Sequence, residues 1–214
     1  MDFTAQRNTM VDSQIRTTDV TSHSVLNAFL AVARETFVAD ALKPLAYSDN
    51  DLEIARGRYI MEPSPLAKML QLAGLSKSDK VLEIGAGNGY ASALLAQLAG
   101  SVVALECDPE LAQQAKTNLA GLSDVKVVTG ALSEGCATQG PYDVILLNGS
   151  VSEVPEALFA QLKEGGRLVG VIGQGLSASA HVFVREHGTQ SQRWAFNASV
   201  PKLPGFDRAA EFVF

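Results

Sequence analysis

Between residues 80 and 172 the chain repeats one pattern: a short apolar run, a break containing Gly, Pro or Asp, and a longer stretch with apolar residues at helical spacing. The apolar runs predict five buried strands, at residues 80–84, 101–108, 125–129, 142–147 and 167–172. Helices are predicted between them, at residues 91–98, 110–122 and 154–162. Strands that alternate with helices in this way form a mostly parallel sheet with helices on both faces.

The segment before this repeat is predicted to be mainly helical. Apolar residues recur at helical spacing in 3–16 and in 24–33, and Pro63-Ser64-Pro65 marks the start of a third helix that ends near Gly74. The stretch 42–62 mixes Pro, Asn, Asp and Gly with isolated apolar residues, which predicts a loop with short strands. Loops of this kind often shape a substrate pocket.

After the repeat, residues 181–186 and 193–198 predict a hairpin of two strands around Gly188, followed by a tail that reaches residues 212–214. The hairpin would form an antiparallel C-terminal edge on a seven-stranded sheet. A chain of 214 residues is long enough for one well-buried domain and short for two. We therefore expect a single α/β domain, in which a helical N-terminal extension and loop (1–62) precede a Rossmann-like core (63–214).

The composition limits the classes of function. A net charge of −6 without any run of Lys or Arg argues against a nucleic-acid partner, which would need a basic patch. No stretch approaches the roughly 20 apolar residues that span a bilayer, and the first residues lack the basic and apolar regions of a secretory signal. We expect a cytoplasmic protein with no nucleic-acid or membrane partner, and the sequence carries no signal for an oligomeric state.

The residues that commonly bind metals are too scattered to form a site. Cys107 and Cys136 have no CxxC spacing, so both are expected to be free thiols in a reducing compartment. His23, His181 and His187 show no metal-ligand spacing with acids or cysteines, and we expect surface or capping roles for them. No metal site is predicted.

The stretch from Lys80 to Tyr90, KVLEIGAGNGY, turns from a buried strand into a helix through three alternating glycines. Glycines in such a turn permit a tight bend, a close approach of the backbone to a ligand, and close packing of the next helix. Glu106 follows about 20 residues after the first glycine, where Rossmann-like folds place a carboxylate against ribose hydroxyls. This order predicts a nucleotide-like ligand; the alternative is a glycine-rich turn that binds none.

The glycine spacing separates two classes of enzyme. Dinucleotide oxidoreductases favour GxGxxG, whereas the run from Gly85 to Tyr90 has its third glycine one position too early. The preceding Leu82-Glu83-Ile84-Gly85-Ala86-Gly87 resembles the first motif of class I methyltransferases that use S-adenosylmethionine. The resemblance implies that Glu106 holds the ribose hydroxyls and that the glycine turn lies beside the amino-acid part of the cofactor. It also implies an acid, Glu83, near that end; the alternative role for Glu83 is to stabilise the turn.

The resemblance also implies the remaining cofactor residues, which follow the predicted strands. Asn148 follows the fourth strand and faces the usual cofactor crevice, although a turn-forming Asn-Gly pair explains it equally well. The expected cofactor site consists of Glu83, Gly85, Ala86, Gly87, Gly89, Glu106, Cys107, Ala131, Leu132 and Asn148.

The N-terminal region narrows the resemblance. The segments that resemble the opening of protein-L-isoaspartate O-methyltransferases are Arg7-Asn8-Thr9-Met10-Val11, Gln14-Ile15-Arg16, residues 32–38 (VARETFV) and Ala46-Tyr47-Ser48-Asp49. The similarity continues through residues 141–145 and 161–169, so it covers most of the chain from Arg7 to Gly173. Members of that family methylate the free carboxylate of an isoaspartyl residue in a damaged protein, which begins its repair. Such a carboxylate is already an anion at neutral pH, so the attacking oxygen needs no base.

Two departures from the family pattern affect the expected site. Where the family has Gly-Gln-Thr-Ile-Ser this chain has residues 57–61, GRYIM, and Met61 cannot donate the hydrogen bond of that serine. Residues 130–132, GAL, replace the family's Gly-Asp-Gly, which removes a polar contact to adenine. Arg58 either binds a substrate carboxylate in a two-pronged contact, with Tyr59 as a wall or hydroxyl donor, or is a solvated loop residue beside a gap-filling Met61.

The first interpretation is therefore an S-adenosylmethionine-dependent O-methyltransferase that acts on isoaspartyl carboxylates of peptides or proteins. One alternative is a methyltransferase of the same fold with a small-molecule acceptor, such as an acid or a phenol. The other is a cofactor-binding protein without catalysis. A nicotinamide dehydrogenase is disfavoured by the glycine spacing.

Overall fold

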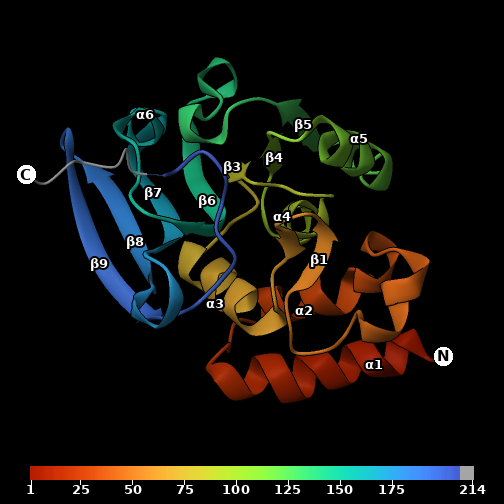
Figure 1. Ribbon diagram of the computed structural model, residues 1–214. Helices are drawn as coiled ribbons and strands as arrows, with labels where there is room; N and C mark the ends of the chain where they lie inside the picture. The colour runs from red at the N-terminus through yellow and green to blue at the C-terminus, as the bar shows by residue number, and fades with distance from the viewer. Residues whose placement is uncertain (208–214) are drawn as a thin grey trace, which may run out of the picture.

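The computed structural model describes residues 1–207, and its centre is a seven-stranded sheet in the order β5-β4-β3-β6-β7-β8-β9 (Figure 1). The strands are β3 (Lys80–Ile84), β4 (Ser101–Glu106), β5 (Val125–Thr129), β6 (Tyr142–Val151), β7 (Leu162–Ile172), β8 (Ser179–Glu186) and β9 (Thr189–Asn197). Strands β3 to β7 are parallel, whereas β8 and β9, blue in Figure 1, form an antiparallel edge. This arrangement confirms the predicted fold class.

Helices cover both faces of the sheet (Figure 1). One face packs against α2 (His23–Ala31), α3 (Pro63–Ala73), α4 (Tyr90–Leu98) and α5 (Pro109–Asn118). The other packs against the short α6 (Glu156–Phe159), the 3-10 turn at 132–134, and Leu203 and Phe206 of the segment after β9. The N-terminal α1 (Phe3–Met10) continues as a π turn (11–15) and a 3-10 turn (16–18). Both α1 and the π turn pack against α2, and the π turn also packs against α3. Within residues 1–207, none of the helices combines the length and the apolar character of a transmembrane span.

The start of α5 and both ends of α3 lie where capping residues in the sequence predicted them. Asp108 caps α5, because its carboxylate accepts hydrogen bonds from the backbone N–H groups of Glu110 and Leu111 at 2.8 and 3.2 Å. The helix α3 begins at Pro63, where a missing N–H is harmless, and ends at Gly74, whose φ of +56° is the left-handed conformation of a helix terminus.

The loop predicted at 42–62 contains short strands, as expected. Two 3-10 turns (34–37 and 40–45) lead into a hairpin of β1 (Leu52–Ala55) and β2 (Arg58–Ile60), which is a two-stranded sheet separate from the main one. The hairpin reaches the carboxyl ends of β3 and β4, where Ile54 lies against Gly87 and Arg58 against Glu106. A hairpin that pairs only with itself depends on such side-chain contacts for its position.

Strand β6 is longer than the prediction, which ended it at residue 147. It continues through Asn148 and Gly149 to Val151, so the turn considered for this Asn-Gly pair was wrong. The extension is stabilised by a segment beyond β9: the Ser150 N–H donates to the Pro201 carbonyl, and the Leu203 N–H donates to the Ser150 carbonyl, both at 2.8 Å. Pairing with residues 201 and 203, distant in the sequence, therefore overrides the local turn signal.

Other boundaries were also predicted wrongly, and the two strands of the C-terminal hairpin begin earlier than expected, at 179 and 189 instead of 181 and 193. The helix expected at 154–162 is limited to α6, because Leu162 already pairs with Tyr142 in the sheet and β7 starts there rather than at 167. The helix α5 ends at Asn118 instead of 122. The second core strand ends at Glu106 instead of 108, since Asp108 caps the next helix. The C-terminal hairpin turns at His187 and Gly188, as predicted around Gly188, whereas the tail at 212–214 lies outside the described residues.

Arg34 ties the N-terminal extension to the hairpin. It is fully buried, and its hydrogen bonds go to backbone carbonyls: Nε donates to that of Ala46 at 2.8 Å and Nη2 to that of Met61 at 2.9 Å. The guanidinium also lies 4.8 Å from the centre of the Tyr90 ring. These contacts hold the end of β2 in place.

We predict that Arg34→Ala lowers the free energy of unfolding by about 3 kcal/mol, because it opens a cavity and leaves two buried carbonyls unpaired. Urea denaturation at neutral pH measures this change. Arg16→Ala is the control: Arg16 pairs with Asp12 on the surface, with both side chains largely exposed, and its loss should cost less than about 1 kcal/mol. Equal effects of the two substitutions would contradict the structural role of Arg34.

Candidate active site

The turn after β3 requires glycine at three positions. Gly85, Gly87 and Gly89 have φ angles of +86°, +57° and +97°, which residues with a side chain rarely adopt. A Cβ on Gly89 would lie 2.7 Å from the Leu119 side chain at the end of α5, and a Cβ on Gly87 would lie 3.1 Å from Ile54 of the hairpin. The turn thus lets a helix pack on one side and the hairpin approach on the other.

Glu106 is the acid at the carboxyl end of β4, and its side chain is fully buried. Its carboxylate accepts hydrogen bonds from the backbone N–H groups of Gly87 at 2.6 Å, Cys107 at 2.9 Å and Asp108 at 3.0 Å. Burial alone would raise the pKa of Glu106, but the hydrogen bonds and charge of Arg58, with these N–H groups, outweigh it and lower the pKa. Glu106 is therefore held as an anion beside the glycine turn.

Arg58 binds the same carboxylate with both terminal nitrogens. Nη1 lies 2.5 Å from Oε1 of Glu106 and Nη2 lies 2.6 Å from Oε2, and the Arg58 side chain is only 11% exposed. Burial acts to lower the pKa of Arg58, and the contacts with Glu106 outweigh it, so the pKa is raised. The interpretation of Arg58 as a solvated loop residue was wrong. Its predicted role toward a substrate carboxylate remains a prediction, because here it pairs with a carboxylate of the protein.

Glu83 supports the turn from below. This residue of β3 is fully buried, and its carboxylate accepts hydrogen bonds from Ser92 Oγ at 2.5 Å and from Asn148 Nδ2 at 2.9 Å. Asn148 also donates to the Gly85 carbonyl at 3.3 Å. Burial raises the pKa of Glu83 to about 7, against the opposing effect of its two hydrogen-bond donors. Glu83 thus connects β3, α4 and β6 under the glycine turn.

Cys107, Ala131 and Leu132 lie at the carboxyl ends of β4 and β5. The two ends are adjacent, since the Gly130 N–H donates to the Glu106 carbonyl at 3.0 Å. Leu132 is buried, Cys107 is half-buried and Ala131 is exposed. Burial raises the pKa of the Cys107 thiol, and the charge of Glu106 acts in the same direction. The expected cofactor residues of β3, β4, β5 and β6 therefore all lie at the carboxyl ends of these parallel strands, on one side of the sheet.

A small cavity lies between the hairpin and the glycine turn. Its volume is about 10 Å³, and its lining includes Tyr59, Met61, Ala86 and Asn148. Met61 is 3% exposed and packs in the apolar core, whereas Tyr59 lines the cavity and is 38% exposed. The structure thus brings Tyr59 and Met61 to the turn, and Met61 fills an apolar gap.

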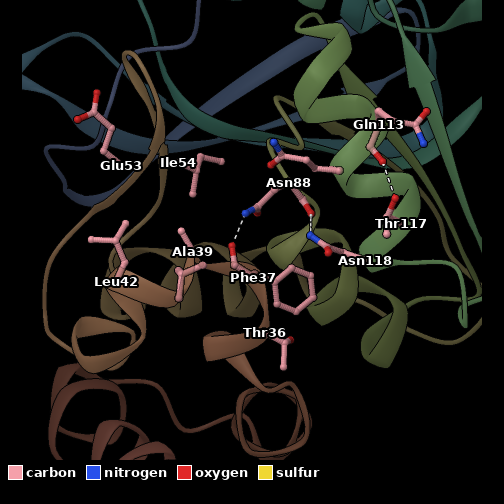
Figure 2. Close-up of a pocket in the computed structure, with 12 residues that line it drawn as sticks. Thr36, Phe37, Ala39, Leu42, Glu53, Ile54, Asn88, Gln113, Thr117 and Asn118 are labelled. Atoms are coloured by element: carbon pink, nitrogen blue, oxygen red, sulfur yellow. Dashed lines mark hydrogen bonds between the residues drawn. The ribbon is translucent and has the colours of Figure 1, made fainter.

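A larger cavity of about 410 Å³ lies beside the turn, between the hairpin, the segment after α2, and α5 (Figure 2). It is lined by Thr36, Phe37, Val38, Ala39, Leu42, Glu53, Ile54, Asn88, Gln113, Gln114, Thr117 and Asn118. Asn88 stands at its inner end: its Nδ2 donates to the Phe37 carbonyl, and its own backbone carbonyl accepts from Asn118 at 2.9 Å. The buried Oδ1 of Asn88 has no hydrogen-bond partner among residues 1–207. The expectation that the 42–62 loop shapes a pocket agrees with this cavity, since Leu42, Glu53 and Ile54 line it. The part played by Asn88 was not predicted; a polar residue inside the glycine run was the available signal.

The described part of the chain contains no candidate metal site. Within residues 1–207 no group of three His, Cys, Asp or Glu side chains is arranged to hold a metal ion. Cys107 and Cys136 are free, as predicted. The arrangement at the sheet edge instead suits an organic ligand, because it offers a buried carboxylate, backbone N–H groups and apolar walls.

Comparisons with known proteins agree on one family. The family model described as protein-L-isoaspartate(D-aspartate) O-methyltransferase matches residues 5–199. The protein-L-isoaspartate O-methyltransferase of Koribacter versatilis (strain Ellin345) is 42% identical over 193 residues, which are 89% of this chain and 86% of that protein. Protein-L-isoaspartate O-methyltransferase 1 of Rhodopseudomonas palustris (strain HaA2) is 41% identical over 204 residues, which are 94% of this chain and 83% of the relative.

Solved structures give the same result for the fold. A protein-L-isoaspartate O-methyltransferase superposes with a TM-score of 0.81 and 30% identity, covering 93% of this chain and 66% of its own length. A second structure, described as a putative member of that family from Plasmodium falciparum in complex with S-adenosyl-L-homocysteine, has a TM-score of 0.78 at 20% identity. That similarity covers 94% of this chain and 99% of the other, and supports the fold alone.

We predict that Glu83 makes the fold less stable as pH rises. Its pKa in the folded protein is about 7, above the unfolded value of about 4.3, so the folded state binds the proton more tightly. The resulting stabilisation is complete below the unfolded pKa and is lost as pH rises through about 7. Between pH 4.5 and 8, the free energy of unfolding of the unaltered protein should therefore fall by about 3 kcal/mol more than that of Glu83→Gln.

Urea denaturation across this pH range measures the difference. Glu186→Gln, at the exposed end of β8, is the control and should follow the curve of the unaltered protein. Parallel curves for Glu83→Gln and the unaltered protein would show that the Glu83 carboxyl does not titrate with folding.

Proposed function

The chain belongs to the protein-L-isoaspartate(D-aspartate) O-methyltransferase family, and from this premise we propose that it transfers the methyl group of S-adenosylmethionine to the free carboxylate of isoaspartyl residues in peptides and proteins. The observation that carries the proposal is the family match over residues 5–199, which spans the glycine turn and its partner acid Glu106. The protein is thus a methyltransferase that uses S-adenosylmethionine.

The residues at the sheet edge fit this cofactor. The glycine turn leaves its backbone bare for the amino-acid part, because its positive φ angles exclude side chains. Glu106 provides an ionised carboxylate for the ribose hydroxyls, and Leu132 and Cys107 provide an apolar wall for adenine. When bound, the cofactor supplies an electrophilic methyl group on a sulfonium ion.

The reaction requires positioning rather than proton transfer. An acceptor carboxylate with a reference pKa near 4 is ionised at neutral pH, so its oxygen attacks without a general base. The protein must hold that oxygen in line with the methyl group, at roughly 3 Å, and keep water away. The buried residues around the small cavity, including Met61, Leu66 and Tyr90, supply a dry wall for this step.

One observation, at the residues expected to bind the methyl acceptor, favours a second candidate function. Met61 takes the place of the family's serine and is buried, so it offers no hydroxyl to an acceptor. Arg58 and Tyr59 on β2 are the polar residues that we assign to that end instead. A small acid or a phenol is the alternative acceptor, since an altered binding segment changes acceptor choice more readily than it changes the cofactor.

The remaining properties of the proposal concern partners and location. An acidic chain with a net charge of −6 is unsuited to a nucleic-acid acceptor, so we propose peptides and proteins as its partners. Two free thiols support a reducing compartment, and we place the protein in the cytoplasm.

We predict selective methylation of a synthetic isoaspartyl peptide, with its normal aspartyl twin as the control. Transfer of labelled methyl from S-adenosylmethionine measures it, and Met61→Ser is assayed in parallel. Activity of the unaltered protein would show that the serine is dispensable, and Met61→Ser should then change kcat/KM by less than about tenfold. Labelling of neither peptide, with cofactor binding intact, would contradict the isoaspartyl acceptor and favour the small-molecule alternative.

We predict that Glu106→Ala weakens binding of S-adenosylhomocysteine by roughly tenfold or more, because the variant cannot form charge-assisted hydrogen bonds to the ribose. Isothermal titration calorimetry measures the dissociation constant. Glu186→Gln, on the antiparallel edge of the sheet, is the control and should bind normally. Unchanged affinity in Glu106→Ala would remove Glu106 from the cofactor site.

A further inference from the structure

The Glu106 carboxylate is fully engaged by protein donors. Oε1 accepts from Arg58 Nη1 and from the N–H groups of Cys107 and Asp108, and Oε2 accepts from Arg58 Nη2 and the Gly87 N–H. A carboxylate has about four acceptor sites, and five N–H donors share them here, with the Cys107 thiol as a further weak donor to Oε1 at 3.5 Å. A pair of ribose hydroxyls can bind Glu106 only if some of these donors leave.

Arg58 is the donor that is free to leave. The three N–H groups belong to the backbone of the glycine turn and of the start of α5, which the sheet and the Asp108 cap hold in place. Arg58 instead reaches Glu106 through a long side chain from a strand of three residues, next to the exposed turn at Arg56 and Gly57. Its release changes side-chain torsions and leaves the sheet intact.

The acceptor end needs a cation, and the described residues that line the small cavity include none. An acceptor carboxylate that is taken out of water must be paired or hydrogen-bonded. Among residues 1–207, the lining consists of apolar residues, Tyr, Asn and Gly, and includes no Lys, Arg or His. Arg34 lies behind Met61 and Tyr90 but is fully buried and donates to backbone carbonyls. Arg58 directly precedes Tyr59, Ile60 and Met61, which line this cavity.

We propose that Arg58 changes partner during the reaction cycle: it pairs with Glu106 in the free protein, the cofactor ribose displaces it, and the released guanidinium binds the acceptor carboxylate. The inference rests on the proposed function, since it takes a carboxylate as the acceptor. Arg58 is thereby the acceptor-binding residue, in place of the hydroxyl that Met61 does not have, and it acts only after the cofactor has bound.

This exchange explains acceptor choice as well as order. Arg58 gives up one bidentate carboxylate contact and regains an equivalent one only if the acceptor also presents a carboxylate. A neutral acceptor would leave the guanidinium unpaired in a half-buried site. The arrangement therefore favours binding of the cofactor first and of a carboxylate acceptor second.

The first measurement concerns the cofactor alone. Titration calorimetry with S-adenosylhomocysteine compares the unaltered protein with Arg58→Gln and with Arg56→Gln, a matched control at the exposed hairpin turn. Because Arg58→Gln removes the competitor, it should bind roughly tenfold more tightly, whereas Arg56→Gln should bind normally. Unchanged or weaker binding by Arg58→Gln overturns the proposal.

The second measurement concerns the acceptor. With S-adenosylhomocysteine saturating, the unaltered protein should bind an isoaspartyl peptide at least about tenfold more tightly than in its absence, and more tightly than the same peptide with that carboxylate replaced by an amide. Arg58→Gln should lose both preferences. In kinetics, its KM for the peptide should rise while its KM for S-adenosylmethionine falls, and Arg58→Lys should restore part of the peptide affinity. An unchanged peptide KM in Arg58→Gln overturns the proposal.

These outcomes separate the inference from the proposed function. Methylation of the isoaspartyl peptide by the unaltered protein, together with normal behaviour of Arg58→Gln, would uphold the function and overturn the exchange. Failure of the unaltered protein to methylate the peptide, together with tighter S-adenosylhomocysteine binding by Arg58→Gln, would overturn the isoaspartyl function and support displacement of Arg58 by the cofactor. Thermal unfolding confirms that Arg58→Gln and Arg58→Lys are folded before either result is used.

Discussion

The buried carboxylate of Glu106 is the interaction on which the site depends. A charge removed from water must be surrounded by donors, and those donors come from the β1–β2 hairpin, the glycine turn and the start of α5. The turn brings the Gly87 N–H to the carboxylate only because its three glycines adopt positive φ angles. The positive φ angles of the turn and the charge of Glu106 therefore act together. They fix the relative positions of the hairpin, the glycine turn and the start of α5, which are distant in the sequence.

Much of the fold was predictable because its signals are local. Apolar runs of strand length placed the five parallel strands, and Pro63, Gly74 and Asp108 marked helix ends through hydrogen bonds that span a few residues. The glycine run indicated the strand-to-helix turn, since positive φ angles at alternating positions leave glycine as the natural residue. The places of Glu106 and Glu83 followed from the same run and the next strand.

The features that sequence reasoning missed depend on contacts between distant residues. Arg58 lies 48 positions before Glu106, and nothing in the pattern around either residue encodes their contact. The length of β6 is set by pairing with residues 201–203 rather than by its own turn-forming Asn-Gly pair. The cavity beside Asn88 forms where the segment after α2, the hairpin and α5 meet. The sequence of one segment does not indicate which other segments pack against it.

The segment after β9 has a consequence for how the molecule is made. It returns across the sheet in Figure 1, pairs with Ser150, and sets Leu203 against Gly85 and Gly149. During synthesis on the ribosome, the strands from 80 to 172 are available to pair long before residue 203 leaves the exit tunnel. The strands around the glycine turn therefore leave the ribosome before Leu203, which covers the turn, so this end of the sheet is completed late in synthesis.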